Sequence, residues 1–484
     1  MPAGALDTHI ALIGYMGAGK TTLGGLLAQR LGRSFVDVDS AIEAHSGVSI
    51  ADMFREQGEA AFRAVEEKVI GEALLMPEPS VLALGGGALG SDSTRGRLRG
   101  RAFTVLVEVD AAVAWERAAV SDRPLARDEE QFHTLYAERL PVYETAADAK
   151  ARDLDGALLA AAGIHVGLGA LDELGALVPG DGPVALVADP RVGGIHGAAA
   201  QLALGDRLVS THELPAGEEA KTVAALERLW SELRLDRRGT LVALGGGCTT
   251  DAAGFAAATY LRGIAWVPVP TSLVGQVDAG IGGKTALALP GGKNLVGAFH
   301  WPARVVIDPA LLETLPHVER AEGRAEVVKT GLLAGEPLWE LPEPELVRRC
   351  AAVKAAYCIR DPLDRGPRAA LNLGHTFAHA LEAAGGYAEL THGRAVGLGL
   401  HAALRLSVEH AGLDPSVLRT LEEALPLEPA RVDRERAWEA LHRAKKVESG
   451  RVRLVLLEAP GRPVTGVELP DEAVRAALDG LIAG

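Results

Sequence analysis

The feature that most constrains the fold is a glycine-rich run near the start of the chain. Residues 14–21 read GYMGAGKT and satisfy the pattern G-x-x-x-x-G-K-[ST]. We expect a strand over Ile10–Ile13 before this run and a helix over Leu23–Leu31 after it, which is the context in which the pattern binds nucleotide phosphates. The glycines allow successive backbone N–H groups to surround a phosphate at a helix N-terminus. The run therefore predicts an α/β nucleotide-binding domain.

Polar side chains around this loop have predicted roles. Lys20 is expected to reach the β- and γ-phosphates, and the Thr21 hydroxyl is expected to ligate Mg²⁺. A second strand, predicted over Ser34–Val38, leads to Asp37 and Asp39, and carboxylates beside a phosphate loop can handle Mg²⁺-bound water and a substrate hydroxyl. The loop residues expected to bind ATP are Gly17, Gly19, Lys20, Thr21 and Thr22.

Length and composition exclude several classes of protein. A chain of 484 residues is expected to form two or three domains, and 48% hydrophobic residues with few aromatics fit α/β domains. The formal charge of −15 argues against a general nucleic-acid binder. Cys248, Cys350 and Cys358 are too few for a disulfide framework or a cysteine zinc site. Without a signal pattern or a membrane-spanning apolar run, the chain is expected to be soluble and cytoplasmic.

A second chemistry-bearing run, LNLGHTFAHALEAAGGYAELTHG, covers residues 371–393. His375 and His379 are four residues apart on a predicted helix that ends at a Gly-Gly pair, so both imidazoles would lie on one face. His392 follows 13 residues after His379. Two or three converging imidazoles can hold a divalent transition metal with a position open for substrate. The alternative is that these are surface or capping histidines.

The same run is not a metalloprotease signature. Thr376 occupies the position where H-E-x-x-H requires its glutamate, so a carboxylate ligand or base must come from elsewhere in the chain. Glu326 is the candidate, because it lies on a predicted helix with Lys329 three residues later on the same face.

The densest polar stretch lies in the second half, after a predicted strand that runs into three glycines. A strand predicted over Val184–Ala188 leads to Asp189, a candidate ligand for ribose hydroxyls, and a strand over Thr240–Leu244 runs into three glycines. The Rossmann pattern G-x-G-x-x-G does not follow either strand. Polar groups separated by glycines over residues 260–299 indicate a wall that binds a small, highly oxygenated molecule, or else polar loops between strands.

Residues 1–162 resemble shikimate kinases. After the phosphate loop come FVDVD at 35–39, the spaced motif I-x-x-x-F-x-x-x-G-E-x-x-F-R-x-x-E at 50–66, GGG at 85–87, RPL at 123–125 and R-x-x-x-Y at 139–143. The resemblance implies transfer of the ATP γ-phosphate to shikimate. It places Asp39 at the shikimate hydroxyl, Arg63 and Arg139 on its carboxylate, Gly85, Gly86 and Gly87 against its ring, Asp37 on the Mg²⁺ side and Arg123 on a mobile lid over ATP. Ala126 departs from the family, in which a second leucine is common after RPL.

Residues 163–484 resemble 3-dehydroquinate synthases over essentially their whole length. The matching runs are GFAAATYLRGI, QVD, GGKT, GKNLVGAF, AEVVK, LNLGHTFAHALE and HG. The resemblance implies that Glu326, His375 and His392 bind zinc or cobalt, with His379 as an acid/base residue. This revises the interpretation from spacing alone, in which His379 was a possible ligand.

The same resemblance implies NAD as a cofactor and 3-deoxy-D-arabino-heptulosonate 7-phosphate as the substrate. The implied NAD contacts are Asp189, Glu218, Lys221, Gly246, Gly247, Asp251, Thr271 and Ser272. The implied substrate contacts are Arg262, Asp278, Lys284, Lys293, Asn294, Lys329, Lys354, Arg368, Asn372, Lys445 and Lys446, with Lys284 also expected in catalysis. The residues that depart from the family are Cys248-Thr249-Thr250, Asp364 and Ala444.

The fold expected from these observations is α/β throughout most of the chain. A P-loop kinase domain with a parallel sheet between helices (1–162) would precede an α/β NAD-binding domain (163–315) and an all-helical metal- and substrate-binding domain (316–484). A homodimer through the synthase half is expected, without nucleic-acid or membrane partners. The alternatives are a sugar-phosphate cyclase of another specificity, a related metal-dependent alcohol dehydrogenase, and a first half that binds nucleotide only for regulation.

Overall fold

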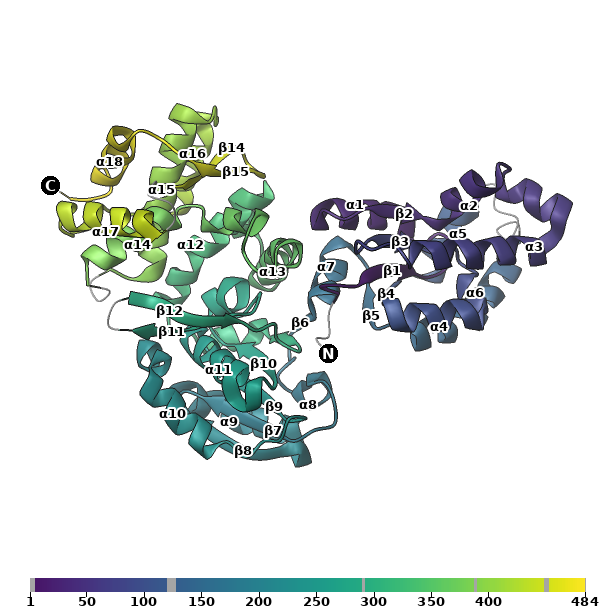
Figure 1. Ribbon diagram of the computed structural model, residues 1–484, viewed down its shortest axis with the longest axis horizontal. Coiled ribbons are helices and arrows are strands. Elements are labelled where there is room, and N and C mark those ends of the chain that lie inside the picture. The colour runs from purple at the N-terminus through teal and green to yellow at the C-terminus, as the bar shows by residue number, and fades with distance from the viewer. Residues whose placement is uncertain (1–4, 120–127, 290–291, 387–389, 448–451, 484) are drawn as a thin grey trace. The chain divides into compact units, whose positions relative to one another are not determined.

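The computed structural model describes residues 5–119, 128–289, 292–386, 390–447 and 452–483 (Figure 1). The chain divides into two compact units, residues 1–164 and residues 165–484. Among the described residues, no helix combines the length and the apolar character that crossing a bilayer requires.

The first unit is built on a five-stranded parallel sheet with the strand order β2-β3-β1-β4-β5. Every residue of the central strand β1 is buried, as expected for a parallel sheet covered by helices. The strands are β1 (His9–Ile13), β2 (Phe35–Asp37), β3 (Val81–Ala83), β4 (Ala102–Val107) and β5 (Ala149–Ala151). The helices are α1 (Lys20–Leu31), α2 (Val38–Ser46), α3 (Ile50–Ala73), α4 (Asp92–Arg101), α5 (Ala111–Ala119), α6 (Glu129–Ala146) and α7 (Leu154–Ala162).

The start of α2 differs from the sequence prediction. The strand predicted to run to Val38 ends at Asp37, whose carboxylate accepts the backbone N–H of Ser40 and caps α2. Asp39 therefore lies in the first helical turn and not at the end of a strand. An aspartate is among the best N-cap residues, and capping competes with strand extension at this position.

The second unit begins with a four-stranded parallel sheet in the order β10-β9-β7-β8. Along β7, Ala185 and Val187 face one apolar cluster, whereas the alternate residues face the other, so helices cover both faces. The strands are β7 (Val184–Ala188), β8 (Leu208–Glu213), β9 (Thr240–Gly245) and β10 (Ala265–Pro270). The helices are α8 (Leu174–Leu177), α9 (Pro190–Leu204), α10 (Val223–Glu232) and α11 (Gly247–Thr259).

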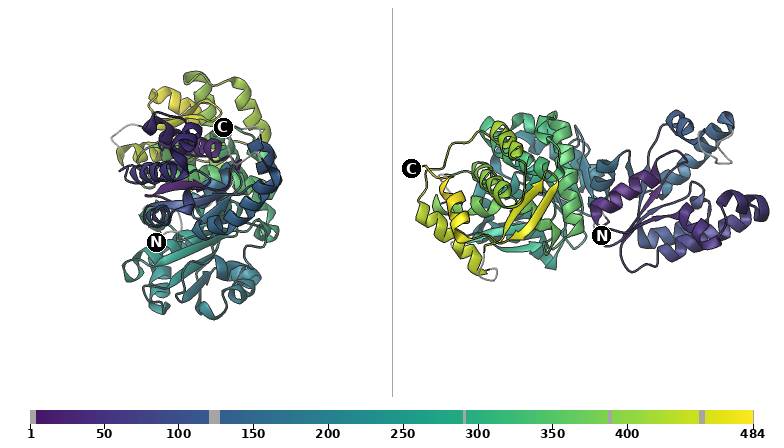
Figure 2. Two further views of the ribbon diagram at one scale, coloured as in Figure 1. Left: turned by 90° about the vertical axis from the view of Figure 1, so that its right-hand side faces the viewer. Right: turned by 90° about the horizontal axis from the view of Figure 1, so that it is seen from above.

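Three pairs of strands complete the β-structure of the described residues. The short strands β6 (Ile164–Val166) and β13 (Val305–Ile307) pair with each other. The antiparallel hairpin of β11 (Lys284–Leu289) and β12 (Gly292–Phe299) packs on α11. A second hairpin, β14 (Leu454–Ala459) and β15 (Arg462–Val467), packs against α15 (His392–His410) near the C-terminus (Figure 2).

The C-terminal part is helical, as predicted, although the sequence analysis did not anticipate the β14–β15 hairpin. Its turn contains Gly461 at φ +78°, a conformation that glycine adopts without strain. A large apolar core joins the helices to β14. The remaining helices are α12 (His317–Ala334), α13 (Glu343–Arg360), α14 (His375–Ala384), α16 (Pro415–Ala424), α17 (Arg434–Val447) and α18 (Asp471–Asp479).

Glycines bring α12, α14 and α15 into backbone contact. A Cβ built on Gly399 of α15 would lie 2.1 Å from the carbonyl oxygen of Gly374, the residue that precedes α14. A Cβ built on Gly393, in the first turn of α15, would lie 2.1 Å from the carbonyl oxygen of Glu322 on α12. Gly374 itself has φ +80°, which other residues rarely adopt. These positions require glycine, because any side chain would separate the helices.

We predict that Gly399→Ala destabilises the second unit by about 1–3 kcal/mol, because the added methyl group overpacks the α14–α15 contact. Calorimetric unfolding of the full chain measures the change. Gly194→Ala is the matched control: Gly194 lies in α9 with open space around its Cβ position, and the same substitution there should raise stability by about 0.4–1 kcal/mol. Equal stability of the two variants would contradict the packing interpretation.

Candidate active sites of the two units

The phosphate loop of the first unit joins β1 to α1 and borders a pocket of about 240 Å³. Gly17 and Gly19 have φ +80° and +85°, and a Cβ on Gly17 would lie 2.3 Å from the carbonyl oxygen of Ala114. The backbone of the loop can therefore follow this path only with glycine. The predicted residues that line the pocket are Gly17, Gly19, Lys20, Thr21, Asp37, Asp39 and Gly86; Thr22 is exposed on α1.

Thr21 and Asp37 come together at the mouth of this pocket. The Thr21 hydroxyl donates a hydrogen bond to the Asp37 carboxylate at 2.6 Å. A hydroxyl and a carboxylate side by side, next to a phosphate loop, are oxygen ligands of the kind that Mg²⁺ prefers. The donor set therefore fits Mg²⁺.

Two arginines flank the glycine triplet that follows β3. Arg139 of α6 donates a hydrogen bond to the Gly86 carbonyl oxygen at 3.0 Å. A Cβ on Gly87 would lie 2.3 Å from the Arg63 guanidinium, and a Cβ on Gly85 would lie 3.1 Å from an Asp39 oxygen. The structure thus brings together the residues that were predicted to hold a hydroxylated carboxylic acid.

The structure adds two residues to this site that the sequence analysis missed. Glu66, buried one turn after Arg63 on α3, forms an ion pair with it at 2.6 Å, and burial raises the pKa of Glu66. Its spacing of three residues from Arg63, which places both on one helix face, was the feature of the sequence that could have identified it. Arg117 of α5 lines the nucleotide pocket, and nothing in its local sequence marked it. Arg123, predicted on a lid, lies outside the described residues.

A pocket of about 330 Å³ lies at the ends of β7, β9 and β10 in the second unit. Asp189 caps α9 by accepting the backbone N–H groups of Arg191 and Val192 at 3.1 and 3.0 Å. Five predicted NAD contacts line the pocket, namely Asp189, Gly246, Gly247, Thr271 and Ser272. Cys248 and His196 also line it and were not predicted to do so.

The other three predicted NAD contacts form a neighbouring polar cluster. Lys221 lies 2.6 Å from the Asp251 carboxylate and also donates to the Asn294 side chain. Glu218 forms an ion pair with Lys293 at 3.2 Å. This cluster connects the dinucleotide side of the unit to the β11–β12 hairpin, on which Lys293 and Asn294 lie.

The predicted substrate contacts include a compact group of charges, in which the half-buried Asp278 meets the buried Lys329 and Lys354. Asp278 lies 2.7 Å from Lys354 and 3.4 Å from Lys329. Lys329 also pairs with Glu326 at 2.5 Å. Burial lowers the pKa of Lys354, whereas for Lys329 the two neighbouring carboxylates outweigh burial and raise the pKa. A pair of buried ammonium groups offers a strong site for an anionic substrate group.

The remaining predicted substrate contacts differ in burial and in their partners. Arg368 is buried and donates to the carbonyl oxygen of Gly282 at 2.9 Å. Lys284 forms an ion pair with Asp364, one of the residues that depart from the family pattern. Burial raises the pKa of the Cys358 thiol, which lies among the charges of Arg368, Lys354, Asp278 and Lys284. Arg262 and Asn372 are exposed, and the side chains of Lys445 and Lys446 lie outside the described residues.

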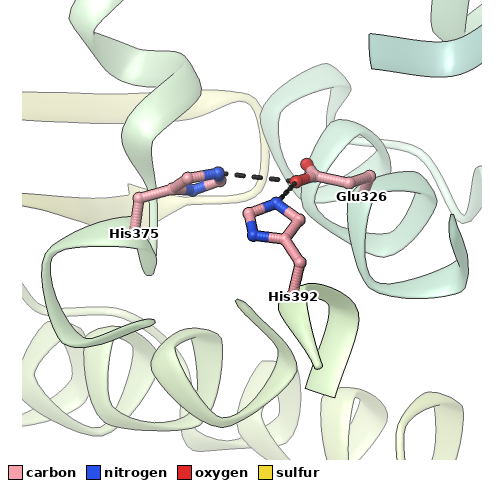
Figure 3. Close-up of side chains that lie close together, drawn as sticks. All are labelled: Glu326, His375 and His392. Atoms are coloured by element: carbon pink, nitrogen blue, oxygen red, sulfur yellow. Dashed lines mark hydrogen bonds and ion pairs between the residues drawn. The ribbon is translucent and has the colours of Figure 1, made fainter. Parts of the chain in front are cut away.

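Glu326, His375 and His392 converge on one point (Figure 3). Glu326 lies on α12 and is fully buried, whereas His375 and His392 are the first residues of α14 and α15. The Nε2 atoms of His375 and His392 lie 3.4 and 3.2 Å from Oε1 of Glu326. One ligand atom from each of these three residues lies within 4.8 Å of the other two. Within the described part of the chain, these residues are the group that could hold a metal ion.

The second nitrogen of each imidazole supports a metal-binding role. Nδ1 of His375 donates to the Leu373 carbonyl oxygen at 3.2 Å, and Nδ1 of His392 lies 3.4 Å from Glu382. Metal-binding histidines usually make such a bond through the ring nitrogen that does not ligate the metal. Both Nε2 atoms are thereby oriented toward Glu326, and two histidines with one carboxylate suit a zinc site with an open position.

His379 lies beside this group but does not belong to it. Its ring centre is 5.6 Å from that of His375, one helical turn earlier on α14. Burial, followed by the charge of His375, lowers the pKa of His379 to about 4. Spacing alone had suggested a cluster of histidines that could include His379, and the structure groups Glu326 with His375 and His392 instead.

Glu382 is a further residue of this site that the sequence analysis missed. It is buried on α14, and its Oε1 atom lies 3.4 Å from Nδ1 of His392 and 3.8 Å from Nζ of Lys293. Its distance of seven residues from His375 places both on one face of the helix, which was the signal that could have found it.

We predict that Glu382→Gln weakens zinc binding by about 10- to 100-fold, because the carboxylate that orients the His392 ring is lost. Competition with a chromophoric chelator measures the dissociation constant. Glu422→Gln, which changes an exposed glutamate on α16, is the control and should bind zinc as the wild type does. Unchanged affinity in Glu382→Gln would contradict this role.

Known protein families match the two units of the chain separately. The family model of shikimate kinase matches residues 16–157. The models of the 3-dehydroquinate synthase N-terminal and C-terminal parts match residues 211–322 and 323–447. The 3-dehydroquinate synthase of Bordetella pertussis is 41% identical over 343 residues, which are 65% of this chain and 95% of the relative.

Two solved structures resemble the second unit in fold. A 2-deoxy-scyllo-inosose synthase, in complex with carbaglucose-6-phosphate, NAD⁺ and Co²⁺, has a TM-score of 0.60 at 24% identity, covering 66% of this chain and 96% of that one. The 2-epi-5-epi-valiolone synthase of Streptomyces hygroscopicus, with NAD⁺ and Zn²⁺ bound, gives the same TM-score, identity and coverage.

Proposed function

This chain belongs to the 3-dehydroquinate synthase family through its second unit and matches the shikimate kinase family through its first, and from this premise we propose which residues perform the two reactions. One reaction phosphorylates shikimate with ATP to give shikimate 3-phosphate. The other converts 3-deoxy-D-arabino-heptulosonate 7-phosphate to 3-dehydroquinate and phosphate. We assign residues 1–162 to the kinase, 163–315 to the NAD-binding part of the synthase and 316–484 to its metal- and substrate-binding part.

The kinase proposal depends on the pocket that the phosphate loop shares with Asp37 and Asp39. Lys20 and the loop amides bind the phosphates of ATP, and the Thr21–Asp37 pair holds Mg²⁺. Arg63 and Arg139 bind the shikimate carboxylate, so that the ring lies against the glycine triplet. Asp39 then lies at the attacking hydroxyl and accepts its proton. Arg123 would bring positive charge to the transferred phosphoryl group.

The synthase proposal depends on the convergence of Glu326, His375 and His392. These residues would hold a zinc or cobalt ion, and the pocket along β7, β9 and β10 would hold NAD. When bound, NAD⁺ takes up and returns a hydride, and the metal supplies Lewis acidity at the substrate oxygens.

The chain's own side chains orient the substrate between these two sites. Lys329, Lys354 and Arg368 provide fixed positive charges that suit a phosphate and a carboxylate. Asp278 holds both lysine side chains in place. His379, one turn from a metal ligand, is positioned to move protons at the substrate. Lys284 adds a further polar group to the substrate site.

We also propose that the synthase half forms a homodimer and acts in the cytoplasm. The β11–β12 hairpin exposes the apolar side chains of Leu295, Val296 and Phe299, and contact with a second copy would bury them. All three cysteines are free thiols, which suits a reducing compartment.

We predict that Asp39→Asn lowers shikimate-dependent ATP consumption by about 10²- to 10⁴-fold, because the carboxylate that accepts the hydroxyl proton is lost. A coupled assay of ADP release on the full chain measures the rate. Glu72→Gln, an exposed change on α3, should keep the wild-type rate. An unchanged rate in Asp39→Asn would favour the alternative that the first unit binds nucleotide only for regulation.

Removing transition metal should separate the two activities. After treatment with a chelator and dialysis into Mg²⁺, we expect dehydroquinate formation to fall by more than about 100-fold and to return with Zn²⁺ or Co²⁺. Kinase activity of the same sample is the internal control and should persist, because only Mg²⁺ serves it. Mass spectrometry of the products from heptulosonate phosphate identifies the reaction. Absence of dehydroquinate with metal and NAD present would favour a cyclase of another specificity.

A further inference from the structure

Glu322 links the helix that carries Glu326 to the helix that begins with His392. It lies on α12, one turn before Glu326. Its Oε1 atom accepts a hydrogen bond from the Thr391 hydroxyl at 2.7 Å, and its Oε2 atom accepts the Gly393 N–H at 2.7 Å. The two donors flank His392, so both oxygens of one carboxylate hold the residues on either side of a metal ligand.

This contact takes the place of an ordinary helix cap. Thr391 is the N-cap residue of α15, but its side chain makes no capping hydrogen bond within its own helix. Glu322 instead satisfies one of the free N–H groups of the first turn, and its negative charge suits the N-terminus of a helix. The carboxylate therefore comes from a different helix and restrains the separation of α12 and α15.

Backbone packing at the same place prevents α15 from moving closer to α12. A Cβ on Gly393 would lie 2.1 Å from the carbonyl oxygen of Glu322, so α15 cannot move closer to α12. The hydrogen bonds of the Glu322 carboxylate oppose movement away. Glu382 orients the His392 ring through Nδ1, whereas Glu322 holds the backbone from which the ring projects.

We propose that Glu322 is a positioning residue for the metal site: it fixes the first turn of α15 so that Nε2 of His392 stays within reach of a metal bound to Glu326. The proposal rests on the metal site assigned above. Glu322 itself would not ligate the metal, because both of its oxygens are directed to α15.

The test is zinc affinity of the full-length chain, measured by chelator competition, together with the visible absorption of the Co²⁺-loaded protein. We expect Glu322→Ala to weaken zinc binding by about 10-fold or more, the range found when outer partners of metal ligands are removed, and to change the Co²⁺ spectrum. The zinc affinity of Glu322→Gln should lie between the affinities of the wild type and of Glu322→Ala. The glutamine amide oxygen can still accept the Gly393 N–H and its NH₂ group can donate to the Thr391 hydroxyl oxygen, but the negative charge at the N-terminus of α15 is lost.

Glu343→Gln is the matched control, because Glu343 links α12 to α13 through an ion pair with Arg320 and, among the described residues, forms no ion pair with α15. It should keep wild-type zinc affinity and the wild-type Co²⁺ spectrum. The proposal is overturned if Glu322→Ala binds zinc as the wild type does, or if Glu343→Gln weakens binding equally. If Glu322→Ala does not fold, Glu322→Gln decides, and wild-type affinity in that variant overturns the proposal. A wild-type chain that fails to bind zinc would instead refute the metal site itself.

Discussion

The second unit depends on the close packing of α12, α14 and α15. Where Gly374 meets Gly399 and where Gly393 meets Glu322, backbone lies directly on backbone. Because no side chain separates the helices, the first residues of α14 and α15 project toward the middle of α12, and these residues are His375 and His392. The arrangement has an electrostatic cost, since two helix N-termini direct their positive ends toward a site for a cation. Three carboxylates offset it: Glu326 is buried at the centre, Glu382 lies behind His392, and Glu322 lies at the start of α15.

In both units, the groups proposed to bind ligands are placed by the same physical rule. In a parallel sheet, the strands end at one edge, and the loops that follow them gather there. In the first unit, the phosphate loop follows β1, Asp37 ends β2 with Asp39 just beyond it, and the glycine triplet follows β3. In the second unit, Asp189 follows β7, Gly246 and Gly247 follow β9, and Thr271 and Ser272 follow β10. The two proposed sites thus lie at equivalent edges of two sheets, and their proposed chemistry differs because the loops differ.

The sequence was most informative where function depends on local pattern. The phosphate loop, the buried strands and the end of α14 at its glycine pair could all be predicted, because each depends on residues that are neighbours in the chain. Site residues were harder to predict where contacts between residues far apart in the chain determine which side chains meet. The spacing of the histidines favoured a cluster that could include His379, since nothing local indicates that α12 lies opposite α14. Glu322 gave no signal, and the spacing of Glu382 from His375 indicated only a shared helix face, because the partners of both glutamates lie on α15. The pattern of residues 34–38 predicts that Asp39 follows a strand, but the Asp37 side chain caps α2, so Asp39 lies in the first helical turn.

The central claim is that Glu326, His375 and His392 of one chain form a single transition-metal site. The most direct measurement is a crystal structure of the zinc-loaded full-length chain, with anomalous diffraction recorded at the zinc absorption edge. We predict one strong anomalous peak about 2.0–2.2 Å from a Glu326 oxygen and from Nε2 of both histidines. A peak bound by His379 in place of Glu326, or the absence of a peak at this site while zinc occupies another place in the second unit, would contradict the account.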